Sequence, residues 1–99
     1  MFDQYYPVVV QALAGEDSTI YVYFTDGSIH QYDMKPLIAR GGVFERLRDE
    51  KFFKEGLTVM NSTAAWDLSG HYDPTDCIDI DPFELYEAEV VEDPLREAV

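Results

Sequence analysis

Residues 19–32 read TIYVYFTDGSIHQY, and this stretch decides the fold. Two runs rich in β-branched and aromatic residues, 19–24 and 28–32, flank Asp26 and Gly27. Gly27 can adopt the positive φ that a tight hairpin turn requires. The stretch therefore predicts two antiparallel strands joined by a short turn.

The length of that turn sets the strand register, and a one-residue slip would turn every side chain of a strand to the opposite face. A two-residue loop would place Phe24 opposite Ile29. A three-residue loop, with Gly27 as a bulge, places Phe24 opposite Ser28 instead. We favour the three-residue loop, because it gathers the apolar side chains on one face of the sheet.

In the favoured register, four residues share the buried face: Ile20, Val22, Phe24 and Tyr32. Three others share the opposite, more exposed face: Tyr21, Tyr23 and Ile29. Aromatic side chains are enriched in the cores of protein interfaces, which makes this second group a candidate partner-binding surface. The alternative is a second layer of core beneath the helical connection that follows. His30, opposite Val22, is interpreted as a half-exposed strand histidine.

The helical connection begins directly after the hairpin. Asp33 is placed to cap a helix over residues 34–40. A second short turn is predicted to point three apolar side chains at the core: Val43, Phe44 and Leu47. Asp49 is then placed to cap a last turn over residues 50–54.

The rest of the chain predicts a second hairpin and a final helical turn. Residues 57–60 and 63–66 form the hairpin strands. Ile78 and Ile80 alternate with acidic residues, so a short extended segment would bury the isoleucines and leave the acids in solvent. Pro82 is suited to the first position of the last turn.

These elements predict an α+β fold: an antiparallel three-stranded meander that begins at residues 8–13, a short helical connection, a second hairpin and a short C-terminal helical turn. A chain of 99 residues has the size of one domain, which we place at residues 1–88. Residues 89–99 are predicted to be an acidic, flexible tail, because four of these eleven residues are acidic and only one is basic.

Charge is distributed unevenly along the chain. From Asp67 to the end there are eleven acidic residues and one basic residue, and 1 − 11 gives −10 of the total of −13. Such a protein repels anionic lipid and attracts a partner with a basic surface. Asp79 and Asp81, predicted to lie in solvent, are candidate contacts for that partner.

Six of the seven Lys and Arg residues lie between Lys35 and Lys54. Three acids are interleaved with them, and 6 − 3 gives this basic segment a net charge of +3. A weak basic patch on a strongly acidic body argues against direct nucleic-acid binding. We expect the bases to pair within the protein, Glu50 with Lys54 and others with the acidic C-terminal third.

No catalytic or metal-binding motif stands out. Residues 71–81 contain one His, one Cys and four Asp, but their spacing fits neither an EF-hand loop nor a zinc site. Aspartates near Cys77 raise the pKa of its thiol, which is the opposite of what a nucleophile needs. Asp26 and His30 could in principle act as a catalytic acid and base across the hairpin. An ordinary turn residue and a half-exposed strand histidine explain them as well. The sequence therefore predicts no catalytic residue, no metal and no cofactor.

Localisation follows from two further features. Cys77 is the only cysteine, so no internal disulfide can form, and the N-terminus lacks the basic start and apolar run of a secretory signal. These features predict a cytoplasmic protein. The longest apolar stretches fall short of the ~20 residues needed to cross a bilayer, so no membrane insertion is expected.

Short motifs spread over residues 7–87 resemble those of a known family. They are Phe24-Thr25-Asp26-Gly27, Tyr32-Asp33, Gly42-Val43-Phe44, Leu47, Phe52, Trp66, and Asp79-Ile80-Asp81-Pro82 followed by Leu85-Tyr86. In this order they resemble the small bacterial domain-of-unknown-function family 2442 (DUF2442). The resemblance implies an α+β fold with a three-stranded meander and no established activity. It also implies a gene beside that of another small protein, in pairs resembling toxin–antitoxin systems.

The chain departs from that family in the longer loop over residues 67–78, to which the resemblance assigns no role. Two function hypotheses result. The first is a non-catalytic protein–protein interaction module, accessory or antitoxin-like, that binds a partner with a basic surface or a second copy of itself. The alternative is a small ligand-binding protein or enzyme that uses the concave face of the sheet, lined by Tyr23, His30 and Tyr32. A deep pocket holding His30 beside a carboxylate would favour the alternative.

Overall fold

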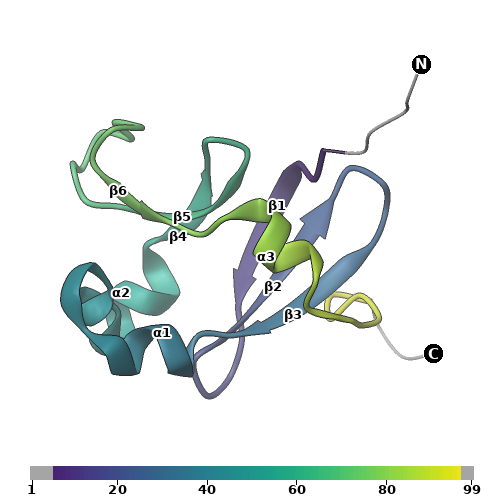
Figure 1. Cartoon of the computed structure of the whole chain (residues 1–99), viewed down its shortest axis with the longest axis horizontal. Coiled ribbons are helices and arrows are strands. Elements are labelled where there is room, and N and C mark those ends of the chain that lie inside the picture. The colour runs from purple at the N-terminus through teal and green to yellow at the C-terminus, as the bar shows by residue number, and fades with distance from the viewer. Residues whose placement is uncertain (1–5, 97–99) are drawn as a thin grey trace.

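Two antiparallel sheets joined by a helical connection make up the fold (Figure 1). The computed structural model describes residues 6–96. The first sheet has the order β1-β2-β3-β7, formed by β1 (Val9–Ala14), β2 (Thr19–Phe24), β3 (Ile29–Asp33) and β7 (Glu89–Val90). The second has the order β4-β5-β6, formed by β4 (Leu57–Met60), β5 (Thr63–Asp67) and β6 (Cys77–Asp79). The helices are α1 (Lys35–Arg40), the 3-10 helix η1 (Gly42–Arg48), α2 (Glu50–Glu55) and α3 (Pro82–Tyr86). The predicted α+β class is confirmed.

The β2–β3 hairpin has the register of the three-residue loop. Val22 lies opposite His30, and Ile20 lies opposite Tyr32. The backbone N–H of Phe24 donates to the carbonyl of Ser28 at 3.0 Å. Gly27 has a φ of 89°, a conformation that other residues adopt only with strain. The turn residue therefore selects the register that buries the apolar face.

A hydrophobic core joins the two sheets and the helices. The first sheet contributes Ile20, Val22 and Phe24, each no more than 3% exposed. Trp66 of β5 is fully buried in the same core, and its indole Nε1 donates to the carbonyl of Phe53 at 2.9 Å. This hydrogen bond ties the second sheet to α2 and satisfies the one polar atom of the indole ring.

The helical connection differs from the prediction at Val43. In η1, Phe44 and Leu47 lie three residues apart, which in a 3-10 helix places them on the same face. Leu47 is buried and Phe44 half-buried, whereas Val43 falls on another face and is 71% exposed. The prediction that Val43 points at the core is therefore wrong. Asp49 caps α2 as predicted, because its carboxylate accepts from two backbone amides of the first turn.

The second hairpin turns at Asn61 and Ser62, which both have positive φ, 55° and 62°. Positive φ at both central residues characterises the type I′ turn that suits the twist of a two-residue hairpin. β6 then pairs with β5, and both Ile78 and Ile80 are 3% exposed. The predicted extended segment with buried isoleucines is confirmed.

After α3, which crosses in front of the first sheet in Figure 1, the chain returns to the edge of that sheet. The sequence predicts a tail that does not pack beyond Ala88, and for residues 89–91 this is wrong. β7 pairs with β3, with Val90 opposite His30, and the N–H of Val91 donates to the carbonyl of Ile29 at 2.8 Å. Backbone pairing needs no apolar side chains, which is why composition gave no sign of it.

Candidate functional site

The outward face of the first sheet carries the predicted partner-binding residues Tyr21, Tyr23 and Ile29. Across the strands, Tyr23 lies between Gln11 and Ile29, and Tyr21 lies between Leu13 and Gln31. These six residues are called the tyrosine face: Gln11, Leu13, Tyr21, Tyr23, Ile29 and Gln31. Gln11 is exposed and the other five are half-buried. The structure thus places the three predicted residues together, on the more exposed side of the sheet.

Contacts within the protein occupy part of the tyrosine face. A Cβ atom at Gly15 would lie 2.7 Å from Cε2 of Tyr21, so the Tyr21 ring rests on bare backbone. The hydroxyl of Tyr23 donates to the carboxylate of Asp93 at 2.5 Å. Burial and this hydrogen bond raise the pKa of Tyr23 to about 12, and the same bond lowers the pKa of Asp93. The segment that reaches this face is therefore the C-terminal one, whereas the sequence pointed to the helical connection.

The C-terminal segment, residues 89–96, buries little of its own apolar surface. Val90 is 65% exposed and Leu95 is 59% exposed. Its contacts with the first sheet include the β7–β3 pairing, the Val91 N–H bond to Ile29, the Tyr23–Asp93 bond and a bond between Tyr23 and the Leu95 backbone, and Val91 is half-buried. Because burial of apolar surface is the main source of stability, this segment is held less firmly than the core strands.

Asp79 and Asp81, the other predicted partner contacts, lie on the second sheet and at the start of α3. Both are exposed. The carboxylate of Asp79 accepts from the side-chain amide of Asn61 at 3.2 Å, and that of Asp81 accepts from the N–H of Phe83 at 2.9 Å and caps α3. They belong to other elements than the tyrosine face, so the predicted residues form two sites and not one.

The acidic loop after β5 is closed by its own hydrogen bonds. The carboxylate of Asp67 accepts from Ser69 and from the backbone of Gly70 and Tyr72, and the bond from the Ser69 hydroxyl is the main cause of its lowered pKa. Burial first, and then the charge of Asp79, raises the pKa of Cys77. Within residues 6–96, no group of three or more His, Cys, Asp or Glu side chains is arranged to hold a metal ion. No helix in the same range is long and apolar enough to cross a bilayer.

His30 is not the half-exposed residue that the sequence predicts. It is 3% exposed, because the register places it on the core side of β3. Its ring lies 5.0 Å from that of Phe24 and 4.9 Å from that of Tyr86. Tyr32 shares the core side, whereas Tyr23 points to the other face. The three residues of the ligand-binding alternative therefore do not line one cavity.

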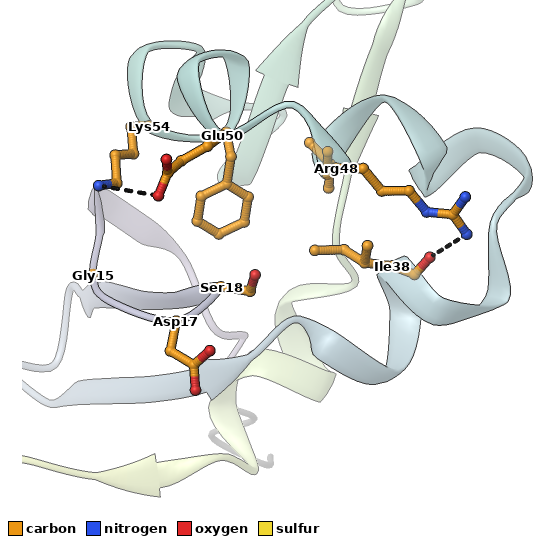
Figure 2. A pocket seen from close by; sticks show the side chains of 9 residues that line it. Gly15, Asp17, Ser18, Ile38, Arg48, Glu50 and Lys54 are labelled. Atoms are coloured by element: carbon orange, nitrogen blue, oxygen red, sulfur yellow. Dashed lines mark hydrogen bonds and ion pairs between the residues drawn. The ribbon is translucent and has the colours of Figure 1, made fainter.

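A cavity of about 220 Å³ lies instead between the β1–β2 turn and the helical connection (Figure 2). Its lining includes the buried side chains of Leu47 and Phe53. Figure 2 shows Glu50 and Lys54 facing each other at one side, where their charged atoms are 3.6 Å apart. The guanidinium of Arg48 is turned toward the carbonyl of Ile38 and donates to it at 3.3 Å. The charged groups of this cavity thus serve contacts within the fold.

The basic segment, residues 35–54, forms ion pairs with only some of the predicted partners. Glu50 pairs with Lys54 as predicted. Lys35, however, pairs with Asp17 at 3.2 Å and with Asp33 at 3.1 Å, in the β1–β2 turn and at the end of β3. Among residues 6–96, no ion pair joins the basic segment to the acidic C-terminal third. That part of the prediction is wrong, because the helical connection packs beside the β1–β2 turn.

These features define a small α+β protein whose first sheet presents a half-exposed aromatic face. Comparison with protein families identifies a match over residues 9–90 to a family described as "Protein of unknown function (DUF2442)". The chain belongs to this family, as the sequence motifs indicate. Searches of curated proteins and of solved structures find no match.

Proposed function

We propose that this protein is a non-catalytic protein–protein interaction module that binds its partner on the tyrosine face. The observation that carries the proposal is the pairing of a half-exposed aromatic face with a lightly held segment across it. Tyr21 and Tyr23 offer large, rigid rings with polar tips, a combination enriched in interface cores. Displacing residues 89–96 would release Tyr23 from Asp93, and the exposed Val90 and Leu95 would lose little buried apolar area.

Charge supports a partner with a basic surface. The net charge of −13 steers such a partner toward the protein at low salt. Asp79 and Asp81 are exposed and contribute to the negative surface of β6 and α3. In a two-gene pair, a module of this kind would act as an accessory or antitoxin-like protein that covers a basic surface of its partner in the cytoplasm.

The test is capture of the product of the adjacent gene by purified wild type and by two double variants. Tyr21→Ser with Tyr23→Ser removes the rings of the tyrosine face, and we expect it to abolish capture at any salt concentration at temperatures where the variant is still folded. Full capture by this variant would reject the proposal.

Asp79→Asn with Asp81→Asn removes charge and keeps both oxygen acceptors, since Asn caps helices as well as Asp does. We expect this variant to bind more slowly at low salt and to match the wild type at high salt. An unchanged association rate at low salt would show that these two acids take no part in steering.

A further inference from the structure

The two ring nitrogens of His30 lie within hydrogen-bond distance of Ala88 and Ser28, and Ser28 in turn contacts Asp26. Nδ1 lies 2.9 Å from the carbonyl oxygen of Ala88, the residue before β7. Nε2 lies 2.9 Å from the hydroxyl oxygen of Ser28, two residues before His30 and just before β3. The hydroxyl oxygen of Ser28 is also 2.6 Å from Oδ1 of Asp26 in the β2–β3 turn. A buried histidine thus connects the hairpin turn to the beginning of the C-terminal segment.

The number of hydrogen atoms available to these hydrogen bonds defines the protonation state of the His30 ring. Hydrogen bonds from Ser28, first among its causes, lower the pKa of Asp26 to about 2, so this carboxylate only accepts. The single hydrogen of the Ser28 hydroxyl therefore points to Asp26, and the Ser28 oxygen accepts from Nε2. The carbonyl of Ala88 has no hydrogen to give, so Nδ1 donates to it. Both ring nitrogens donate, which only the protonated imidazolium can do.

Neither neutral form of the ring satisfies the same atoms. With hydrogen on Nδ1 alone, the Ser28 hydroxyl must turn to Nε2, and two oxygen atoms then face each other across 2.6 Å with no hydrogen between them. With hydrogen on Nε2 alone, the Nδ1 lone pair faces the lone pairs of the Ala88 carbonyl at 2.9 Å. Loss of the proton therefore breaks either the turn contact or the contact to the C-terminal segment.

The groups that surround the ring are acidic or uncharged. From the β2–β3 turn, Asp26 faces it through one hydroxyl group, and from α3 the Tyr86 ring packs against it with its own hydroxyl donating to Asp26 at 2.6 Å. Phe24 of β2 packs an uncharged ring against it in a T-shaped arrangement. On the last side, exposed Glu87 and Glu89 flank Ala88. Every charged group on these elements is therefore negative.

We propose that His30 is a proton-dependent contact that holds the C-terminal segment on the first sheet. With the ring protonated, Ala88 is bound and residues 89–93 follow β3 to the Tyr23–Asp93 bond. When the ring loses its proton, this contact is lost and the segment opens from the tyrosine face more often. The consequence for partner binding rests on the proposed function, but the contact itself does not.

The test follows the amide hydrogen exchange of Val91, whose N–H bonds to Ile29, while NMR records the titration of the His30 ring from about pH 5 to about pH 9. After correction for the intrinsic pH dependence of exchange, we expect the protection of Val91 to fall about tenfold as the ring loses its proton. His30→Gln, which does not titrate, should give a flat profile. A titrating ring with constant Val91 protection would overturn the proposal.

Asp26→Asn is the second variant and does not depend on whether His30→Gln folds. The amide oxygen of the new side chain can still accept from the backbone N–H and the hydroxyl of Ser28, but the negative charge that faces the ring through this hydroxyl is removed. We therefore expect the ring of this variant to lose its proton at lower pH than in the wild type, and an unchanged or higher midpoint would contradict the link from Asp26 through Ser28 to the ring. Partner capture with the tyrosine variants is read separately, so the proposed function and this contact can fail independently.

Discussion

β2 and β5 are both central strands, but only β5 is closed on both faces. Residues 63–66 of β5 are all buried, none more than 2% exposed. β2 alternates, with Ile20 and Val22 fully buried and Tyr21 and Tyr23 half-buried. The second sheet is therefore a scaffold element, and the first sheet keeps one face that other groups can cover.

Hydrogen bonds connect the β4–β5 turn to β6 and to the acidic loop, residues 67–78. Ala65 is fully buried although it points away from Trp66 and the core. The side-chain amide of Asn61 donates to the carbonyl of Pro74 and to Asp79, which sits opposite Ala65. These hydrogen bonds tie the acidic loop to the second sheet, whereas the C-terminal segment lies on the first sheet.

The largest effect is expected for Trp66→Ala, which should lower the free energy of unfolding by about 3–5 kcal/mol in urea denaturation. The substitution empties a fully buried site and leaves the carbonyl of Phe53 without its donor. Tyr23→Ala, which removes a ring from the tyrosine face, is the control and should cost less than about half as much. Equal costs would remove the distinction between the two strands.

Ala65→Leu tests how tightly the outer face of β5 is packed in comparison with the outer face of the first sheet. The added atoms must displace the Asn61 side chain or the acidic loop, and we expect a cost of about 1–3 kcal/mol by the same measurement. Ile29→Leu, a matched change on the half-buried outer face of β3, should cost well under about 1 kcal/mol. A neutral Ala65→Leu variant would show that the loop is not a tight cover.

The two tight turns provide a smaller and opposite effect. Ser18 and Ser62 each have a left-handed conformation, with φ of 57° and 62°, which is unfavourable for residues with a Cβ atom. Ser18→Gly and Ser62→Gly should each raise stability by up to about 1 kcal/mol, after subtraction of the greater chain entropy of glycine. Destabilisation by either substitution, in thermal melting, would contradict the assigned turn geometry.

The smallest effect is expected for Tyr23→Phe, at about 0.5–1 kcal/mol near neutral pH. In the folded protein the pKa of Tyr23 is raised to about 12 from an ordinary value of about 10. Its hydroxyl therefore contributes stability that is complete below about pH 10 and is lost as the pH rises toward about 12. The variant should lose less stability over this range than the wild type, with Tyr21→Phe as the control that keeps the Asp93 bond.

Sequence reasoning succeeded where one residue or one alternation dictates local geometry. Gly27 set the hairpin register, and the alternation at Ile78 and Ile80 marked β6. It failed where the decisive contact is distant. The burial of His30 follows from its position opposite Val22. Its polar side chain indicated a half-exposed residue, because its partners Ala88 and Tyr86 lie far along the chain and could not be identified from the sequence.

The C-terminal segment and the acidic loop show the same limit. β7 is held by backbone groups, and the loop is closed by hydrogen bonds to polar groups such as Asp67, Ser69 and Asp73, so neither has an apolar pattern. The tyrosine face could be identified from alternation in β2, but the acids that actually reach it could not. Asp93 was one of eleven acids after residue 66, and nothing in its neighbours distinguishes it.

The central claim is that the cover over the tyrosine face opens independently of the core, and native-state amide exchange tests it most directly. We expect the amides of β5 to exchange only on global unfolding and the amide of Val91 to exchange at least about a hundredfold faster through local opening. Equal protection of Val91 and β5 would mean that residues 89–96 unfold only with the whole domain, and the tyrosine face would then be a permanent part of the core.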